Sequence, residues 1–130
     1  MSQTVLVVDD EVGALTLIGI MLERGNFEVL KASNAYKALE ILKSQIPDLM
    51  ILDVMMPGMD GIELCRQIRQ MDSTRDVPVL ILSARGDAES VEEGLSAGAN
   101  DYLCKPILHH DLITKIREVL DDSGRSQPPS

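Results

Sequence analysis

The chain has 130 residues, of which 45% are apolar, and its 21 acidic and 12 basic residues give a formal net charge of −9. This length and hydrophobicity predict one folded domain and exclude a wholly disordered chain. The acidic balance excludes direct binding to the phosphate backbone of a nucleic acid, and it favours a metal cation or a basic partner surface.

The N-terminal sequence and the cysteines predict a cytoplasmic location. The chain starts MSQTVLVVDDE, which lacks the basic segment of a signal peptide, and no apolar run is long enough to cross a membrane. Cys65 and Cys104 form neither a CxxC pair nor a disulfide framework. We therefore expect a reduced, cytoplasmic chain without a membrane partner.

The first half of the chain alternates strand-like and helix-like patterns. Residues 4–10 (TVLVVDD) form a β-branched run that ends in acids, and residues 11–24 have the length of a helix. Residues 27–32 (FEVLKA) alternate like a strand, and residues 34–44 begin with an Asn, which favours a helix N-cap. Residues 48–53 (DLMILD) follow as a buried strand.

The second half repeats this alternation. Residues 60–70 carry apolar side chains at helical spacing after an Asp that favours an N-cap, and residues 77–84 (VPVLILSA) are a further apolar run. Residues 87–97 form an acidic helix closed by a Gly, and residues 99–106 (ANDYLCKP) form a short strand. Residues 108–121 carry an apolar helical stripe.

These strand–helix units predict an α/β fold with a doubly wound parallel sheet covered by helices on both faces. We expect the folded domain to span residues 1–121. Residues 122–130 (DSGRSQPPS) are polar, and we expect them to form a flexible tail or the start of a linker.

The residues that end the predicted strands carry chemical groups. Asp9 and Asp10 end the first strand, Asp53 ends the third, Ser83 lies at the end of the fourth, and Lys105 follows the fifth. Ligands of an open parallel sheet bind beyond the carboxyl ends of its strands. We therefore expect these acids, the hydroxyl and the ammonium group to converge on one edge of the sheet.

The chemistry of such a site follows from its charges. Crowded carboxylates demand a cation, and an all-oxygen site suits Mg²⁺, which keeps several waters and often bridges to a phosphate. A carboxylate nucleophile can accept a phosphoryl group and form an acyl phosphate. Mg²⁺ and a lysine would neutralise the charge on the phosphoryl oxygens, and a hydroxyl could donate to a third oxygen.

The motifs VVDDE, ILDVMMPGMDG, LSA and DYLCKP, in this order over residues 4–121, resemble the receiver domain of two-component response regulators. The resemblance implies a flavodoxin-like fold whose parallel strands follow the order 2-1-3-4-5. It also implies a phosphorelay switch rather than a conventional enzyme. A histidine kinase or histidine-phosphotransfer protein would donate the phosphoryl group, and the new conformation would control a downstream effector domain or protein.

The resemblance assigns the acidic residues by position. Asp53 resembles the phosphoacceptor, Asp10 the acid that binds Mg²⁺ directly, and Asp9 its neighbour, which acts mostly through water. Asp53 belongs to the metal site as well, and Met55 would offer its backbone carbonyl to the ion. The domain would also dephosphorylate itself with water, and Met55 and Arg85 are candidates for setting the lifetime of the phosphoryl group.

The resemblance also assigns the switch residues. Ser83 resembles the switch hydroxyl, Tyr102 the aromatic that changes rotamer as Ser83 moves, and Lys105 the lysine that pairs with phosphoryl oxygens. Pro106 resembles the proline that follows through a cis peptide bond. Taken singly, these residues have plainer interpretations: Asp53 could open an Asx-turn, and Tyr102 could be a half-buried aromatic.

One departure from the family pattern lies before the second strand. The family often places Gly ahead of the aromatic residue, whereas Asn26 precedes Phe27 here. The departure concerns the end of a helix, so we expect it to leave the site residues unaffected.

Residues 11–24 have apolar residues on two faces. We expect one stripe to face the core: Ala14, Leu17, Ile18, Met21 and Leu22. Val12, Leu15 and Gly19 lie outside this stripe, and we expect them to help dock the kinase or phosphotransfer protein. Residues 87–107 could form a homodimer surface.

Two other function classes compete with the switch. A Mg²⁺-dependent phosphohydrolase with an aspartyl nucleophile would carry DxD on its first strand and a cap insertion, whereas this chain has consecutive acids there and little room for a cap. A phosphorylation-independent interaction module would have little use for the acidic site. Binding of Mg²⁺ would therefore discriminate between this module and the switch.

Overall fold

The computed structural model describes residues 2–124. Its strands form one parallel sheet in the order β2-β1-β3-β4-β5. The strands are β1 (Thr4–Val8), β2 (Glu28–Ala32), β3 (Leu49–Leu52), β4 (Val79–Ser83) and β5 (Asp101–Cys104). The helices are α1 (Val12–Arg24), α2 (Ala35–Leu42), α3 (Gly61–Gln70), α4 (Ala88–Ser96) and α5 (His109–Asp122). The predicted α/β fold and its strand order are confirmed.

The strands are shorter than the predicted ranges, and most of the predicted site residues lie just past a strand end. Strand β1 ends at Val8, which pairs with Ala32 of β2, so Asp9 and Asp10 lie just past the end of this strand. At the other end of the chain, α5 extends to Asp122, just past the predicted end of the folded domain at residue 121. Within the predicted tail, residues 125–130 lie outside the described residues.

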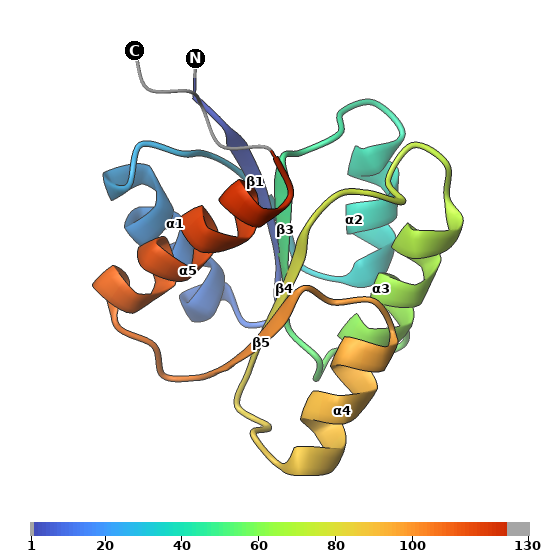
Figure 1. Ribbon diagram of the computed structural model, residues 1–130. Helices are drawn as coiled ribbons and strands as arrows, with labels where there is room; N and C mark the ends of the chain where they lie inside the picture. The colour runs from blue at the N-terminus through green and yellow to red at the C-terminus, as the bar shows by residue number, and fades with distance from the viewer. Residues whose placement is uncertain (1, 125–130) are drawn as a thin grey trace.

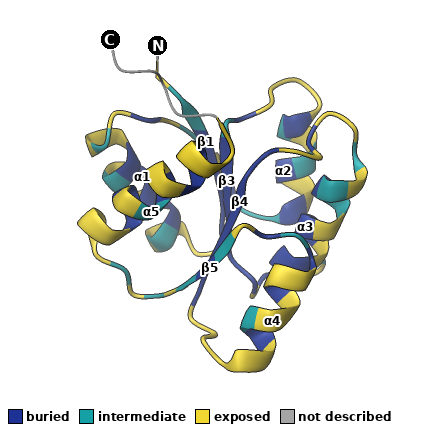
Figure 2. Ribbon diagram, in the orientation of Figure 1, coloured by how far each residue is buried: buried dark blue, intermediate teal, exposed yellow. Residues whose placement is uncertain are grey.

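Helices cover both faces of the sheet (Figure 1). Helices α1 and α5 lie on one face, and α2, α3 and α4 lie on the other. The strands in the middle of the sheet are buried, whereas the outer sides of the helices are exposed (Figure 2). Burial on both faces explains why β1, β3 and β4 consist of nearly continuous apolar residues. Among the described helices, none has the length and apolarity needed to cross a membrane.

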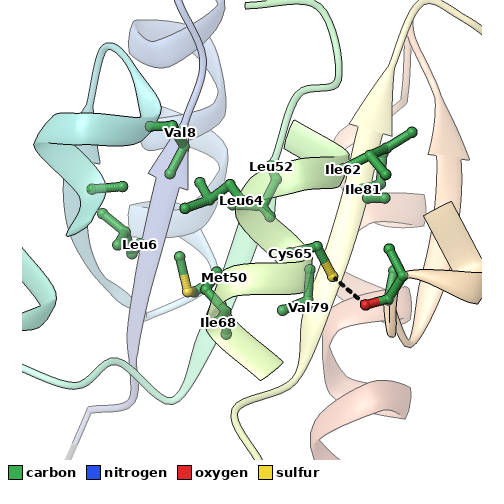
Figure 3. Packing of buried hydrophobic residues seen from close by; sticks show 14 of the residues in the cluster. Leu6, Val8, Met50, Leu52, Ile62, Leu64, Cys65, Ile68, Val79 and Ile81 are labelled. Atoms are coloured by element: carbon green, nitrogen blue, oxygen red, sulfur yellow. Dashed lines mark hydrogen bonds between the residues drawn. The ribbon is translucent and has the colours of Figure 1, made fainter. Parts of the chain in front are cut away.

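Alternate residues of each strand enter the two cores. Val5 and Val7 of β1 pack with α1 and α5, whereas Leu6 and Val8 pack with residues of α2 and α3. Figure 3 shows the second of these clusters, in which aliphatic side chains of β1, β3 and β4 meet the buried side of α3. Both cores are mainly aliphatic, and together they hold the strands rigidly beneath the edge that carries the polar residues.

The predicted core stripe of helix α1 is confirmed at Ile18 and Leu22, but it is wrong at Leu17. The buried residues of this helix are Leu15, Ile18, Gly19 and Leu22, whereas the side chain of Leu17 is 55% exposed. The helix is apolar on most sides, so its sequence contains two stripes with the spacing of a helix face, and the pattern alone does not determine which one is buried. A methyl group at Gly19 would lie 2.7 Å from Cε of Lys31 on β2, which shows how closely this side of the helix approaches the sheet edge.

This orientation corrects the predicted docking residues. Leu15 is 8% exposed and Gly19 is buried, so neither offers a surface to a partner. Val12 is 74% exposed, and Leu17 and Ile20 join it as the exposed large apolar residues of α1.

The departure at Asn26 has a backbone explanation. Asn26 has a φ of 69°, in the left-handed region that favours glycine. Asparagine is one of the few other residues that adopt this conformation routinely. Asn26 therefore fills the role of the family's glycine, and Phe27 packs in the core below it.

Candidate active site

The sheet places the site residues by extending its ladders beyond the strand ends. The N–H of Asp9 donates to the carbonyl of Ala32 at 3.1 Å, and the N–H of Asp53 donates to the carbonyl of Val8 at 2.9 Å. The N–H of Lys105 donates to the carbonyl of Ser83 at 2.8 Å. Because each bond joins neighbouring strands, the three side chains are held at one edge of the sheet, as the sequence predicts.

The three acids at this edge form a compact cluster. Asp9 and Asp53 are 1% and 5% exposed, whereas Asp10 is exposed. One carboxylate oxygen from each of Asp9, Asp10 and Asp53 lies within 4.8 Å of the others. An all-oxygen donor set of this size, with one side open to water, fits Mg²⁺.

Lys105 bridges the two buried acids. Its Nζ lies 2.5 Å from Oδ2 of Asp9 and 3.2 Å from Oδ2 of Asp53. The peptide bond from Lys105 to Pro106 is cis, as the family resemblance predicts. The ammonium group therefore joins Oδ2 of Asp9 to Oδ2 of Asp53.

One lysine does not neutralise both carboxylates. Burial raises the pKa of Asp53, the charge of Lys105 opposes this effect, and the charge of Asp9 raises the pKa further. Burial alone would lower the pKa of Lys105, but its hydrogen bond to Asp9 and the charges of both acids raise it above its ordinary value. The site therefore lacks positive charge, which is what a divalent cation would supply.

The side chains of Ser83 and Tyr102 both form hydrogen bonds with the backbone of Arg85. The buried Ser83 Oγ accepts a hydrogen bond from the N–H of Arg85 at 3.2 Å, and the Tyr102 hydroxyl donates to the carbonyl of the same residue. Tyr102 is 8% exposed, and burial raises the pKa of its hydroxyl. Tyr102 is thus turned inward in this structure, where it contacts the loop that begins at Ser83.

The loop between β3 and α3 begins at Asp53. Asp53 Oδ1 accepts a hydrogen bond from the N–H of Met55 at 3.3 Å, and the side chain of Met55 is exposed. A hollow opens between this loop and the start of the β4–α4 loop, and it is lined by Val54, Met55, Met56, Pro57, Asp60 and Arg85. Met55 and Arg85, the two residues predicted to influence the lifetime of the phosphoryl group, thus border the same hollow.

Gly61 is a site residue that no pattern in the sequence predicted. It is the first residue of α3, and its N–H donates to the carbonyl of Val54 at 3.1 Å. A methyl group at Gly61 would overlap the backbone carbonyl of Asp53. Helix α3 therefore packs directly on the backbone of Asp53, and the signal in the sequence is a Gly immediately after the Asp60 N-cap.

The fold and this site define a class of protein, and comparison with known proteins agrees. The family model of the response regulator receiver domain matches residues 5–117. The phosphate regulon transcriptional regulatory protein PhoB of Pseudomonas aeruginosa is 37% identical over 122 residues, which cover 94% of this chain and 53% of that protein. The chain therefore belongs to the response regulator receiver family, and it spans about half the length of the curated relatives it matches.

Solved structures give the same assignment. A putative response regulator from Chloroflexus aurantiacus superposes with a TM-score of 0.90 at 36% identity, covering 93% of this chain and 99% of that chain. The receiver domain of the sensor histidine kinase PA1611 from Pseudomonas aeruginosa superposes with a TM-score of 0.86 at 29% identity, with the same coverage. That structure has a magnesium ion coordinated in its active site cleft.

Proposed function

We propose that this chain is a phosphorylation switch in which Asp53 accepts a phosphoryl group from a histidine donor. The observation that supports this proposal most strongly is the position of Asp53, a buried carboxylate beside Asp9 and the Nζ of Lys105. A carboxylate oxygen of Asp53 would bond to phosphorus while the bond between phosphorus and the donor nitrogen breaks. The donor imidazole carries a proton on its other ring nitrogen, so the histidine leaves as a neutral ring, and an acyl phosphate remains on Asp53.

The other residues stabilise the transferred group. A Mg²⁺ ion held by Asp9, Asp10, Asp53 and the backbone carbonyl of Met55 would neutralise charge on the phosphoryl oxygens. Lys105 already contacts Oδ2 of Asp53, so its ammonium group is within reach of a phosphoryl oxygen attached there.

Ser83 and Tyr102 would couple phosphorylation of Asp53 to a change in the surface of the protein. Donation from Ser83 Oγ to a phosphoryl oxygen is a contact that exists in the phosphorylated state alone, and such a differential contact is what shifts a two-state equilibrium. Because Ser83 Oγ also accepts from Arg85, its movement would pull on the loop that the Tyr102 hydroxyl holds. The β4–α4 loop and α4 would then present a different surface.

The donor would dock beside α1 on a revised set of residues. An apolar groove runs between α1 and the residues after β5, and it is lined by Ala14, Leu17, Ile18, Met21, Leu82, Lys105, Pro106 and Ile107. The groove reaches Lys105, and through it the site, so a donor helix lying in it would bring its histidine close to Asp53. Val12 remains in the proposed docking face, whereas Leu15 and Gly19 are excluded by their burial.

The output surface would be α4 and β5, within residues 87–107. Its partner would be a downstream effector domain or protein, or a second copy of the chain. The charged residues of α4 are all acidic, at Glu89, Glu92 and Glu93. A homodimer would therefore have to bring basic groups from outside α4 against this helix.

The domain would also remove its own phosphoryl group. A water molecule would approach the phosphorus atom from the side of the hollow that Met55 and Arg85 border. Arg85 lies 3.6 Å from Asp87 in an exposed ion pair, so its side chain can move. The two side chains would set the lifetime of the phosphoryl group by blocking or admitting this water.

Mg²⁺ binding and phosphorylation by acetyl phosphate test the proposal. The switch predicts that the wild-type protein binds Mg²⁺ and gains a labile phosphoryl mass, and that Asp53→Asn gains none. A phosphohydrolase would instead turn over many small phosphate esters without keeping the adduct. An interaction module would remain folded but would neither bind Mg²⁺ nor become phosphorylated.

A further inference from the structure

An exposed tyrosine of helix α2 lies against the loop that follows the phosphoacceptor. Tyr36 is 58% exposed, yet its ring covers Gly58 in the β3–α3 loop. A methyl group at Gly58 would lie 3.1 Å from Cε2 and 3.3 Å from the hydroxyl oxygen of Tyr36. Gly58 has a φ of 78°, so the loop turns sharply beneath the ring at a position that favours glycine.

The loop is also held by its own hydrogen bonds and by packing against the core. The carbonyl of Val54 accepts hydrogen bonds from the N–H groups of Met56 and Gly61, both at 3.1 Å. Met56 is buried, and Met59 packs against the core. The ring of Tyr36 contacts the outer side of the same loop, so the loop is held between the core and an aromatic ring.

The position of this loop matters because it contains Met55. The N–H of Met55 donates to Oδ1 of Asp53 at 3.3 Å, and its carbonyl is one of the proposed Mg²⁺ ligands. Gly58 is three residues further along the chain. A loop that is free to move at Gly58 would therefore hold the backbone of Met55 less firmly beside Asp53.

We propose that Tyr36 is a positioning residue that holds the β3–α3 loop and thereby sets the affinity of the site for Mg²⁺. The inference rests on the proposed function of the acidic site. It adds a residue that contacts neither the ion nor the phosphoryl group and that acts through the backbone of Met55. Residues that orient metal ligands change metal affinity by about 10–100-fold when they are removed. For a single ring contact on one loop, we expect the lower end of this range.

Three variants test the inference. Tyr36→Ala removes the ring, Tyr36→Phe keeps the ring without the hydroxyl, and Ile46→Ala is the matched control. Ile46 is an apolar side chain of similar exposure, at 43%, but it lies before β3, at the opposite end of the sheet from the site. The measurement is Mg²⁺ affinity by calorimetric titration, with urea unfolding in EDTA as the measure of stability.

We expect Tyr36→Ala to weaken Mg²⁺ binding about tenfold, with Tyr36→Phe and Ile46→Ala close to wild type. Because Tyr36 is mostly exposed, Tyr36→Ala should unfold at nearly the wild-type urea concentration, which separates positioning from general destabilisation. Wild-type Mg²⁺ affinity in Tyr36→Ala would overturn this inference alone. Failure of the wild-type protein to bind Mg²⁺ would overturn the proposed function and this inference together.

Discussion

The packing of α3 on the backbone of Asp53 gives the sharpest mutational prediction. Gly61→Ala would place a methyl group where the carbonyl of Asp53 already lies. The obstacle is backbone rather than a flexible side chain, so helix α3 or the end of β3 must shift. Overpacking of this kind costs about 1–3 kcal/mol, and we expect the upper end because the neighbour cannot rotate away.

The helix propensity of alanine offsets part of this cost. Replacing Gly by Ala within a helix stabilises it by about 1 kcal/mol. The expected net loss in the free energy of unfolding is therefore about 2 kcal/mol, which lowers Tm by about 8 °C for a domain of this size. A displacement of Asp53 by less than 1 Å should also slow its phosphorylation by acetyl phosphate. We expect a slowing of about tenfold, because a full 1 Å of misplacement costs about 100-fold.

Gly13→Ala is the matched control for this experiment. Gly13 also lies in the first turn of a helix, α1, but nothing lies within 4 Å of a methyl group at this position. Gly13→Ala should therefore stabilise the protein by about 0.5–1 kcal/mol and leave phosphorylation unchanged. Thermal unfolding and the rate of acetyl phosphate labelling measure both effects. A Gly61→Ala protein with wild-type Tm and labelling rate would refute the reasoning.

Three further predictions follow from the described contacts. Leu17 lines the apolar groove beside α1, so Leu17→Asp should slow phosphotransfer from the histidine kinase about tenfold but leave labelling by acetyl phosphate unchanged. Equal slowing with both donors would show that the donor does not dock in this groove. Asn26→Val should lower the free energy of unfolding by about 1–2 kcal/mol because of its left-handed backbone, whereas Asn26→Gly should not, as urea unfolding would show. In EDTA, Asp53→Asn should raise Tm at neutral pH. Because the pKa of Asp53 is raised in the folded protein, its charged form destabilises the fold at pH values above the ordinary pKa range of aspartate. The gain in Tm from Asp53→Asn should therefore vanish in acid, where Asp53 is protonated. A gain in Tm that does not change with pH would contradict this reasoning.

The sequence was sufficient to predict where the acidic site lies. Asp9, Asp53 and Lys105 each follow an apolar strand, and the carboxyl ends of parallel strands meet at one edge. The hydrogen bonds that extend the ladders beyond the strand ends hold these residues there. For these residues local pattern and topology agree, so the prediction needed no knowledge of side-chain packing.

The orientation of α1 and the support of the β3–α3 loop could not be predicted in the same way. Leu15 and Leu17 each belong to a stripe with helical spacing, and the packing of α1 in the fold buries Leu15 and leaves Leu17 exposed. The contacts of Tyr36 with Gly58 and of Gly61 with Asp53 join residues from different elements. Such contacts leave no periodic pattern in the sequence, so they become visible only in the folded structure.

The most direct test of the central claim is to locate the phosphoryl group. The protein would be labelled with acetyl phosphate and Mg²⁺, reduced with borohydride, which converts an aspartyl phosphate to homoserine, and mapped by peptide mass spectrometry. We predict homoserine at position 53 alone, and none when Mg²⁺ is replaced by EDTA. Homoserine at position 9 or 10, or a folded protein without any label, would contradict the assignment of Asp53 as the phosphoacceptor.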